Sequence, residues 1–178
     1  MNFCELEKLG LEAGFSHVVP LDRTTIEIKS EVREMCRTGN CGAYGKKWSC
    51  PPGCGTLEEC KAQLEQYQWG ILVQTVGPLE DSLDYESMME IEARHKDHFA
   101  QLEKILRKSY PDMLALGAGG CTKCEICTYP DAPCRFPGQA FASMEAFGML
   151  VLQVCKANNL TYYYGPNTMA YTSCFLLK

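Results

Sequence analysis

Apolar residues recur at helical spacing in several stretches of the chain. The clearest stretch is 84–109, where the inward positions step alternately three and four residues apart: Tyr85, Met88, Glu92, His95, Phe99, Leu102 and Leu106. Thr56 and Glu59 form a capping-box pattern that predicts the start of a helix over 56–67. The same spacing predicts helices over 3–14 and 143–157, the latter capped by Ser143. Residues 22–35 fit either helix or strand, and we assign them to a helix.

Strand-like patterns lie between these helices. Residues 69–76 are almost all apolar and end at Gly77-Pro78, which predicts a central, buried strand. Shorter strands are predicted over 16–21 and 113–116. Two more, over 160–164 and 168–177, flank the turn sequence 165–167 and predict a C-terminal hairpin. Helices that alternate with strands predict one α/β (or α+β) domain over residues 1–178, with helices flanking a mixed sheet.

Composition restricts the class of protein. A chain of 178 residues with 46% hydrophobic and 22% charged residues suits a single globular domain. The chain has no apolar run of about 18 residues, so we expect no membrane-spanning helix. A net charge of −5 argues against nucleic acid as the main partner. The acidic N-terminus does not resemble a signal peptide, so we expect a cytoplasmic protein whose thiols stay reduced.

Twelve cysteines are too many for an ordinary cytoplasmic protein without metal, and four of them form one motif. Three lie at intervals of three residues and the fourth follows a loop that contains proline: Cys121, Cys124, Cys127 and Cys134. Cys-x-x-Cys spacing in a tight loop directs successive sulfurs toward one centre. The third regularly spaced cysteine favours an iron–sulfur cluster over zinc, because structural zinc sites usually take cysteines in separated pairs. The run resembles the bacterial ferredoxin motif, with a longer last spacer.

A second cysteine-rich loop precedes the helix over 56–67. Its four cysteines lie within nineteen residues that are rich in glycine, proline and polar side chains: Cys36, Cys41, Cys50 and Cys54. Such a loop has no core of its own to offset the entropy of ordering it, so we expect a metal centre to organise it. The sequence therefore predicts eight metal ligands in two loops.

The other cysteines and the histidines have simpler explanations. Cys4, Cys60, Cys155 and Cys174 fall on apolar positions of predicted helices or strands, so we assign them to the core. His17 is assigned to packing because no other candidate ligand lies near it in the sequence. His95 and His98 are interpreted as one packed and one solvated histidine.

Several segments together resemble a family of uncharacterised, predicted metal-binding proteins found mostly in anaerobic bacteria and archaea. The most specific parts are 44–52 (YGKKWSCPP), the cysteine run over 120–137 and residues 143–148 (SMEAFG). The resemblance extends over nearly the whole chain. It implies that seven cysteines match metal-binding positions, namely Cys36, Cys41, Cys50, Cys121, Cys124, Cys127 and Cys134. The assignment of Cys54 rests on its loop alone, and the family implies no settled activity.

Three functional hypotheses follow. The first is a redox protein with two [4Fe–4S] clusters that passes single electrons to a partner protein. In this hypothesis four basic residues stabilise the anionic clusters, namely Lys46, Lys47, Lys123 and Arg135. Tyr44 and Trp48 shield the clusters from water. Ligands can cross between the loops, with Cys134 serving the Cys36 loop and Cys54 completing the other set. The second is an enzyme in which one cluster has only three protein thiolates and an open iron. The third is an interaction module held by two zinc ions.

Overall fold

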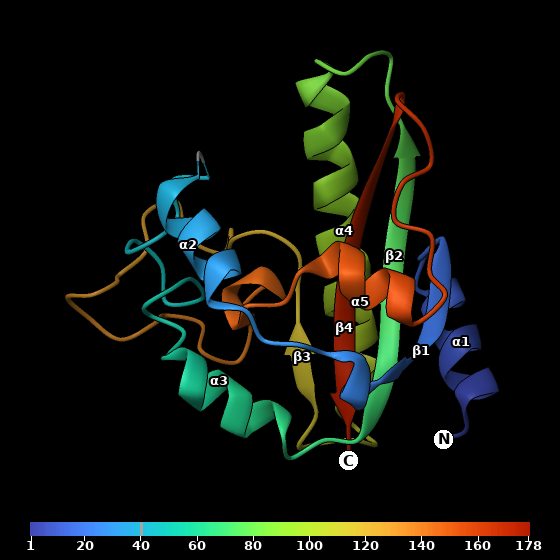
Figure 1. Cartoon of the computed structure of the whole chain (residues 1–178), viewed down its shortest axis with the longest axis horizontal. Coiled ribbons are helices and arrows are strands. Elements are labelled where there is room, and N and C mark those ends of the chain that lie inside the picture. The colour runs from blue at the N-terminus through green and yellow to red at the C-terminus, as the bar shows by residue number, and fades with distance from the viewer. Residues whose placement is uncertain (40) are drawn as a thin grey trace.

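Four strands form one antiparallel sheet at the centre of the chain in the computed structural model, which describes residues 1–39 and 41–178 (Figure 1). They are β1 (His17–Asp22), β2 (Trp69–Pro78), β3 (Leu114–Leu116) and β4 (Thr168–Leu177), in the order β1-β2-β4-β3. The prediction of a single α/β domain is confirmed. The central position of β2 agrees with its unbroken run of buried residues.

The long pair of strands sets the two faces of the sheet. β2 and β4 pair from Trp69–Leu177 to Pro78–Thr168. Successive residues of a strand point to opposite faces, so Ile71 and Phe175 pack into one core cluster and Leu72 and Cys174 into the other. The sheet is therefore buried on both sides.

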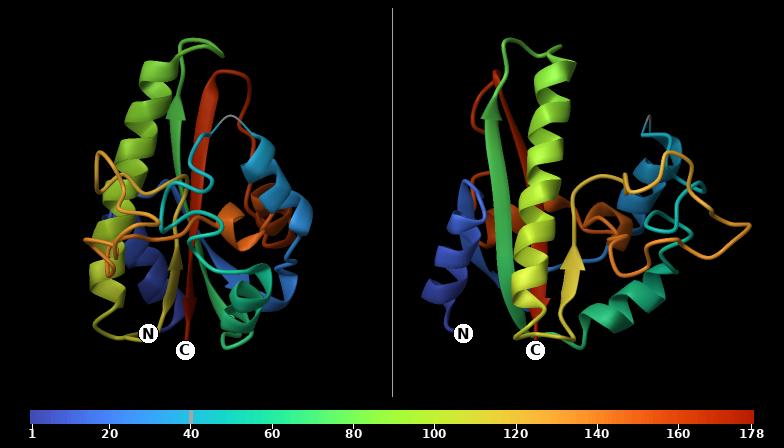
Figure 2. Two further views of the ribbon diagram at one scale, coloured as in Figure 1. Left: turned by 90° about the vertical axis from the view of Figure 1, so that its left-hand side faces the viewer. Right: turned by 180° about the vertical axis from the view of Figure 1, so that it is seen from behind.

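Different helices cover the two faces (Figure 2). One face packs against α1 (Phe3–Glu12) and α4 (Tyr85–Leu106), through residues such as Leu6 and Leu102. The other packs against α3 (Leu57–Leu64), the 3₁₀ turn η2 (Glu145–Phe147) and α5 (Val151–Ala157). Every helix in residues 1–39 and 41–178 lacks either the length or the apolar character needed to cross a bilayer.

The long helix α4 follows its predicted pattern in its second half only. His95, Phe99, Leu102 and Leu106 are buried, as the pattern predicts. The first turns differ, because Ile91 is buried whereas Tyr85 is 68% exposed. The first turn of α4 lies beyond the packed part of the sheet, at the end of β2 (Figure 1). The predicted buried positions of α4 are therefore correct only where the helix packs against the sheet.

Two predictions about the sheet are wrong, the C-terminal hairpin and the mixture of parallel and antiparallel strands. Residues 160–164 form no strand, since β4 already pairs with β2 on one edge and with β3 on the other. The segment is held instead by the buried Gln74 side chain, which donates to the Thr161 carbonyl at 3.0 Å and accepts from the Tyr164 hydroxyl at 2.7 Å. The sheet is not mixed, because all three pairings among the described strands are antiparallel: β1 with β2, β2 with β4, and β3 with β4.

Two predicted helices are interrupted at the same place in the fold. Ile28 and Met149 form an isolated bridge, so the chain is extended at both residues. The predicted helix over 22–35 therefore divides into a 3₁₀ turn, η1 (Arg23–Thr25), and α2 (Ser30–Thr38). The predicted helix over 143–157 divides at Gly148, whose φ of 78° is left-handed. Ser143 therefore caps no long helix; its hydroxyl accepts from the Ala146 amide at 3.1 Å, beside the short turn η2.

Both cysteine-rich loops lie beyond the β3 edge of the sheet (Figure 1). The first joins α2 to α3, and one of its residues, Asn40, lies outside the described residues. The second leaves β3 and returns to η2. The sheet thus supports the loops from one side.

Candidate metal centre

The second cysteine loop is closed at its base by backbone hydrogen bonds. Gly117 donates to the Ala142 carbonyl at 2.8 Å, and Met144 donates to the Gly117 carbonyl at 3.2 Å. Residues 118–142 therefore leave the fold and return to it at one point. Within this closed loop, all four predicted cysteines line a single cavity: Cys121, Cys124, Cys127 and Cys134. The four cysteines chosen by their spacing thus border one cavity, although no three side chains of this set lie close enough together in the described structure to hold a single metal ion.

Backbone amides point at two of these sulfurs. Burial works to raise the pKa of the Cys127 thiol, but hydrogen bonds from the backbone of Tyr129, Trp48 and Thr128 outweigh it and lower the pKa below its ordinary value. Phe136 donates its amide to the Cys134 sulfur at 3.4 Å. Amide donors stabilise a thiolate, and thiolate is the form that binds metal.

The first loop brings three of its cysteines near one another. Burial raises the pKa of Cys36, and the nearby Cys41, Glu145 and Cys50 raise it further. Burial also raises the pKa of Cys50, with smaller contributions from Cys54 and Cys41. Among the described residues, no three His, Cys, Asp or Glu side chains lie close enough together to hold a single metal ion. Glu145 is a neighbour that no sequence motif indicates.

The fourth cysteine of this loop, Cys54, faces a cation and a further cysteine. The Arg33 guanidinium, on α2, donates to the Ala146 and Gly55 carbonyls at 2.8 and 2.7 Å. Its remaining nitrogen lies 3.2 Å from the Cys60 sulfur and 3.6 Å from the Cys54 sulfur. In the described part of the chain, no carboxylate forms an ion pair with Arg33. Cys60 is buried, as predicted, but its contact with Arg33 carries no sequence signal because α2 and α3 are far apart along the chain.

Hydrogen bonding between Cys54 and Cys60 polarises this pair. The hydrogen bond between the two side chains, together with burial, raises the pKa of Cys54. The same bond lowers the pKa of Cys60, and Arg33 adds to that effect against the cost of burial. Cys54 is therefore the member of the pair that holds its proton more strongly.

The two loops are joined directly to each other. Lys47 donates from its amino group to the Cys121 carbonyl at 2.7 Å, and the Cys121 amide donates to the Ser49 hydroxyl at 3.3 Å. A Cβ atom added to Gly120 would lie 3.8 Å from the Cys50 sulfur. The Trp48 indole donates to the Ala132 carbonyl at 3.0 Å. The loops thus pack as one unit, in which Cys50 lies close to the start of the second motif.

The charged and aromatic residues predicted to surround the thiols differ in placement. Lys47, Trp48, Lys123 and Arg135 line the four-cysteine cavity. Arg135 is held there by donating to the Ile126 carbonyl at 2.9 Å. Lys46 is exposed, and Tyr44 is half-buried in the first loop. Three of the four predicted cations therefore lie at the second loop.

The remaining cysteines and histidines mostly follow the core assignment. Cys155 and Cys174 are buried, as expected. Cys4 is exposed, so its assignment to the core is wrong; α1 buries Leu6 and Gly10 against the sheet, and Cys4 lies off that face. His17 is also exposed, although it stacks on Tyr164 with ring centroids 5.5 Å apart.

Comparison with known proteins indicates a metal-binding family. A family model described as "Predicted metal-binding protein (DUF2284)" matches residues 19–177. A search of curated proteins found no match, and neither did a search of solved structures. The resemblance inferred from the sequence is confirmed. Because the match extends over nearly the whole chain, the protein belongs to this family of predicted metal-binding proteins.

Proposed function

We propose that this protein binds two [4Fe–4S] clusters and serves as an electron-transfer protein. The observation that carries the proposal is that the four cysteines of one ferredoxin-like motif line a single cavity. Thiolates are the usual protein ligands of such clusters, and backbone donors to the sulfurs are a recognised means of tuning their potential. Two of these four sulfurs have such donors, Cys127 and Cys134.

The ligand sets follow the two loops. One site is assigned to Cys121, Cys124, Cys127 and Cys134, and the other to Cys36, Cys41, Cys50 and Cys54. The clusters, when bound, supply reversible one-electron oxidation and reduction. The Lys47 and Ser49 contacts between the loops would keep the two clusters at a fixed separation. Lys47 and Arg135 place positive charge beside an anionic centre, which favours its reduced form. The electron partner is proposed to be another protein.

Anaerobic preparation tests this function. Two clusters require roughly eight iron and eight acid-labile sulfide per chain, with absorption at about 400 nm that dithionite bleaches. About two zinc ions per chain without visible colour would instead indicate the zinc-held interaction module. The preparation must exclude air, because zinc can replace iron at cysteine sites once a cluster has been lost.

A second candidate function, an enzyme with an open iron position, is favoured by the contacts of Cys54. Its sulfur lies against Arg33 and Cys60, so the first site is left with Cys36, Cys41 and Cys50 as its remaining thiolates. Three protein ligands leave one coordination position for a substrate. In that case Cys54→Ser keeps its iron, and a small added thiol perturbs the visible spectrum. If Cys54 is a ligand, the same variant loses roughly four iron per chain.

A further inference from the structure

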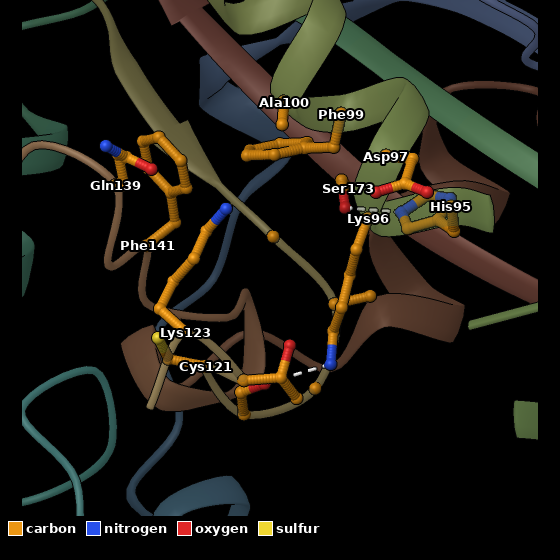
Figure 3. A pocket seen from close by; sticks show the side chains of 15 residues that line it. His95, Lys96, Asp97, Phe99, Ala100, Cys121, Lys123, Gln139, Phe141 and Ser173 are labelled. Carbon is orange, nitrogen blue, oxygen red and sulfur yellow. Dashed lines mark hydrogen bonds between the residues drawn. The ribbon is translucent and has the colours of Figure 1, made fainter. Parts of the chain in front are cut away.

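A cavity of about 190 Å³ lies beside the second cysteine loop, between α4 and the chain that leaves β3 (Figure 3). For comparison, a dry cavity of about 150 Å³ in a protein core admits benzene. The space therefore suits a small molecule with about one ring.

One wall of this cavity is apolar. Phe99 and Phe141 meet edge to face, with ring centroids 5.2 Å apart, and both line the cavity together with Ala100 and Ala118. Aromatic walls of this kind favour an aromatic or compact apolar body in the ligand.

At the polar end of the cavity, under α4, the histidine side chain is neutral. His95 and Ser173 both line the cavity, and the His95 Nε2 atom lies 2.6 Å from the Ser173 hydroxyl. The other ring nitrogen lies 3.0 Å from the Thr75 hydroxyl. Burial lowers the pKa of His95 to about 3, so the ring is neutral at physiological pH. Both side chains are fully buried and already hydrogen-bonded to each other, so this end of the cavity contributes no charge.

The cations of the cavity differ in whether they already have partners. Lys96 forms an ion pair with Glu92 and donates to the Gly120 carbonyl at 3.0 Å. Lys123 forms no ion pair or side-chain hydrogen bond within residues 1–39 and 41–178, and its amino group extends toward Phe141 (Figure 3). Among the described residues that line the cavity, Asp97 on α4 is the one carboxylate. An available cation beside an aromatic pair is complementary to an anion with an apolar body.

We propose that this cavity binds a small organic monocarboxylate with one aromatic ring, with the ring against Phe99 and Phe141 and the carboxylate at Lys123. Cys121 and Lys123 line both this cavity and the four-cysteine cavity, so the ligand lies against the wall of the candidate metal site. Binding itself goes beyond the proposed cluster chemistry and does not require it. Any use of the ligand as a redox substrate rests on the proposed function.

Titration calorimetry with benzoate and its neutral counterpart benzamide tests this site on the metal-loaded protein. Benzoate is expected to bind one site per chain, and more tightly than benzamide. Lys123→Gln should weaken benzoate binding about two- to fivefold and leave benzamide binding unchanged, because only the charge contact is lost. Lys108→Gln is the matched control, since this exposed lysine follows α4 and lies outside the cavity. It should bind both compounds as the wild type does.

Ala100→Phe fills the cavity and should abolish binding of both compounds. Iron content, visible spectrum and thermal unfolding are measured on every variant, so that loss of the fold or of metal is not taken for loss of the site. Absence of benzoate binding to the wild type, or equal effects of the Lys123 and Lys108 substitutions, overturns the proposal. Benzoate binding by protein that takes up no iron would refute the proposed function but not this site. Iron uptake without benzoate binding would refute this site but not the proposed function.

Discussion

Single residues in this structure differ most from their usual behaviour where burial removes water from an ionisable group. His95 is the clearest case, because it is fully buried and both ring nitrogens contact hydroxyl groups, those of Thr75 and Ser173. Its position on the apolar stripe of α4 predicts the burial. The hydroxyl partners come from β2 and β4, and no pattern within the helix indicates them.

The first prediction concerns the titration of His95. Burial lowers its pKa to about 3, below the ordinary value of 6.5. The unfolded chain therefore binds a proton that the folded chain does not, and the folded state loses stability as the pH falls from about 6.5 toward 3, by at most about 1.4 kcal/mol per pH unit. In NMR spectra, the His95 ring resonances should stay those of a neutral imidazole from pH 8 down to about pH 4. Titration of His95 near pH 6.5 would contradict this account of its burial.

The second residue-scale prediction concerns the four-cysteine site. Cys124→Ala removes one of the four thiolates that line the cavity, so the variant should lose roughly four iron per chain in anaerobic preparations. Cys4→Ala is the matched control, because Cys4 is exposed on α1 and outside both loops. Its iron content should equal that of the wild type. Unchanged iron in Cys124→Ala would refute the assignment of this ligand.

At the scale of helices and strands, a prediction from sequence is correct where the segment's own residue pattern determines its structure. β2 is predicted correctly from its apolar run, since it is a central strand buried on both faces. The second half of α4 is predicted correctly from its periodicity, since that half packs against the sheet. Residues 160–164 have a strand-like composition but no free strand edge beside them. The break between η2 and α5 depends on the contact of Gly148 with Lys29, a residue more than a hundred positions away. Propensity cannot report such distant partners.

Gly148 gives a test at this scale. Its φ of 78° is costly for any residue with a Cβ, and that atom would lie 2.9 Å from the Leu57 side chain and 3.0 Å from the Lys29 carbonyl. Gly148→Ala should therefore lower the free energy of unfolding by about 1–3 kcal/mol, as measured by urea denaturation. Gly138→Ala is the control, because nothing lies within 4 Å of an added Cβ there. Equal stability of the two variants would show that the left-handed turn does not constrain the fold.

On the scale of the whole molecule, the chain combines a well-packed sheet with loops that have little core. Most residues of the two core clusters come from the sheet, the helices and η2, and the residues over 118–142 contribute only Phe141 and Ala142, both partly buried. The sequence anticipates this division, because cysteine spacing marks the loops and apolar periodicity marks the sheet. It could not anticipate that the loops would contact each other through Lys47 and Ser49, or that Arg33 would face Cys54 and Cys60.

This division predicts how the molecule responds to loss of metal. The loops depend on metal ligation to offset their ordering entropy, whereas the paired strands β2 and β4 do not. Chelation under reducing conditions should therefore speed amide hydrogen exchange over 41–54 and 118–142 by at least about tenfold, and leave β2 and β4 protected. Mass spectrometry of peptides from both regions, before and after metal removal, measures the difference. If β2 exchanges as fast as the loops after chelation, then metal binding supports the entire fold, and the sheet is not an independent scaffold.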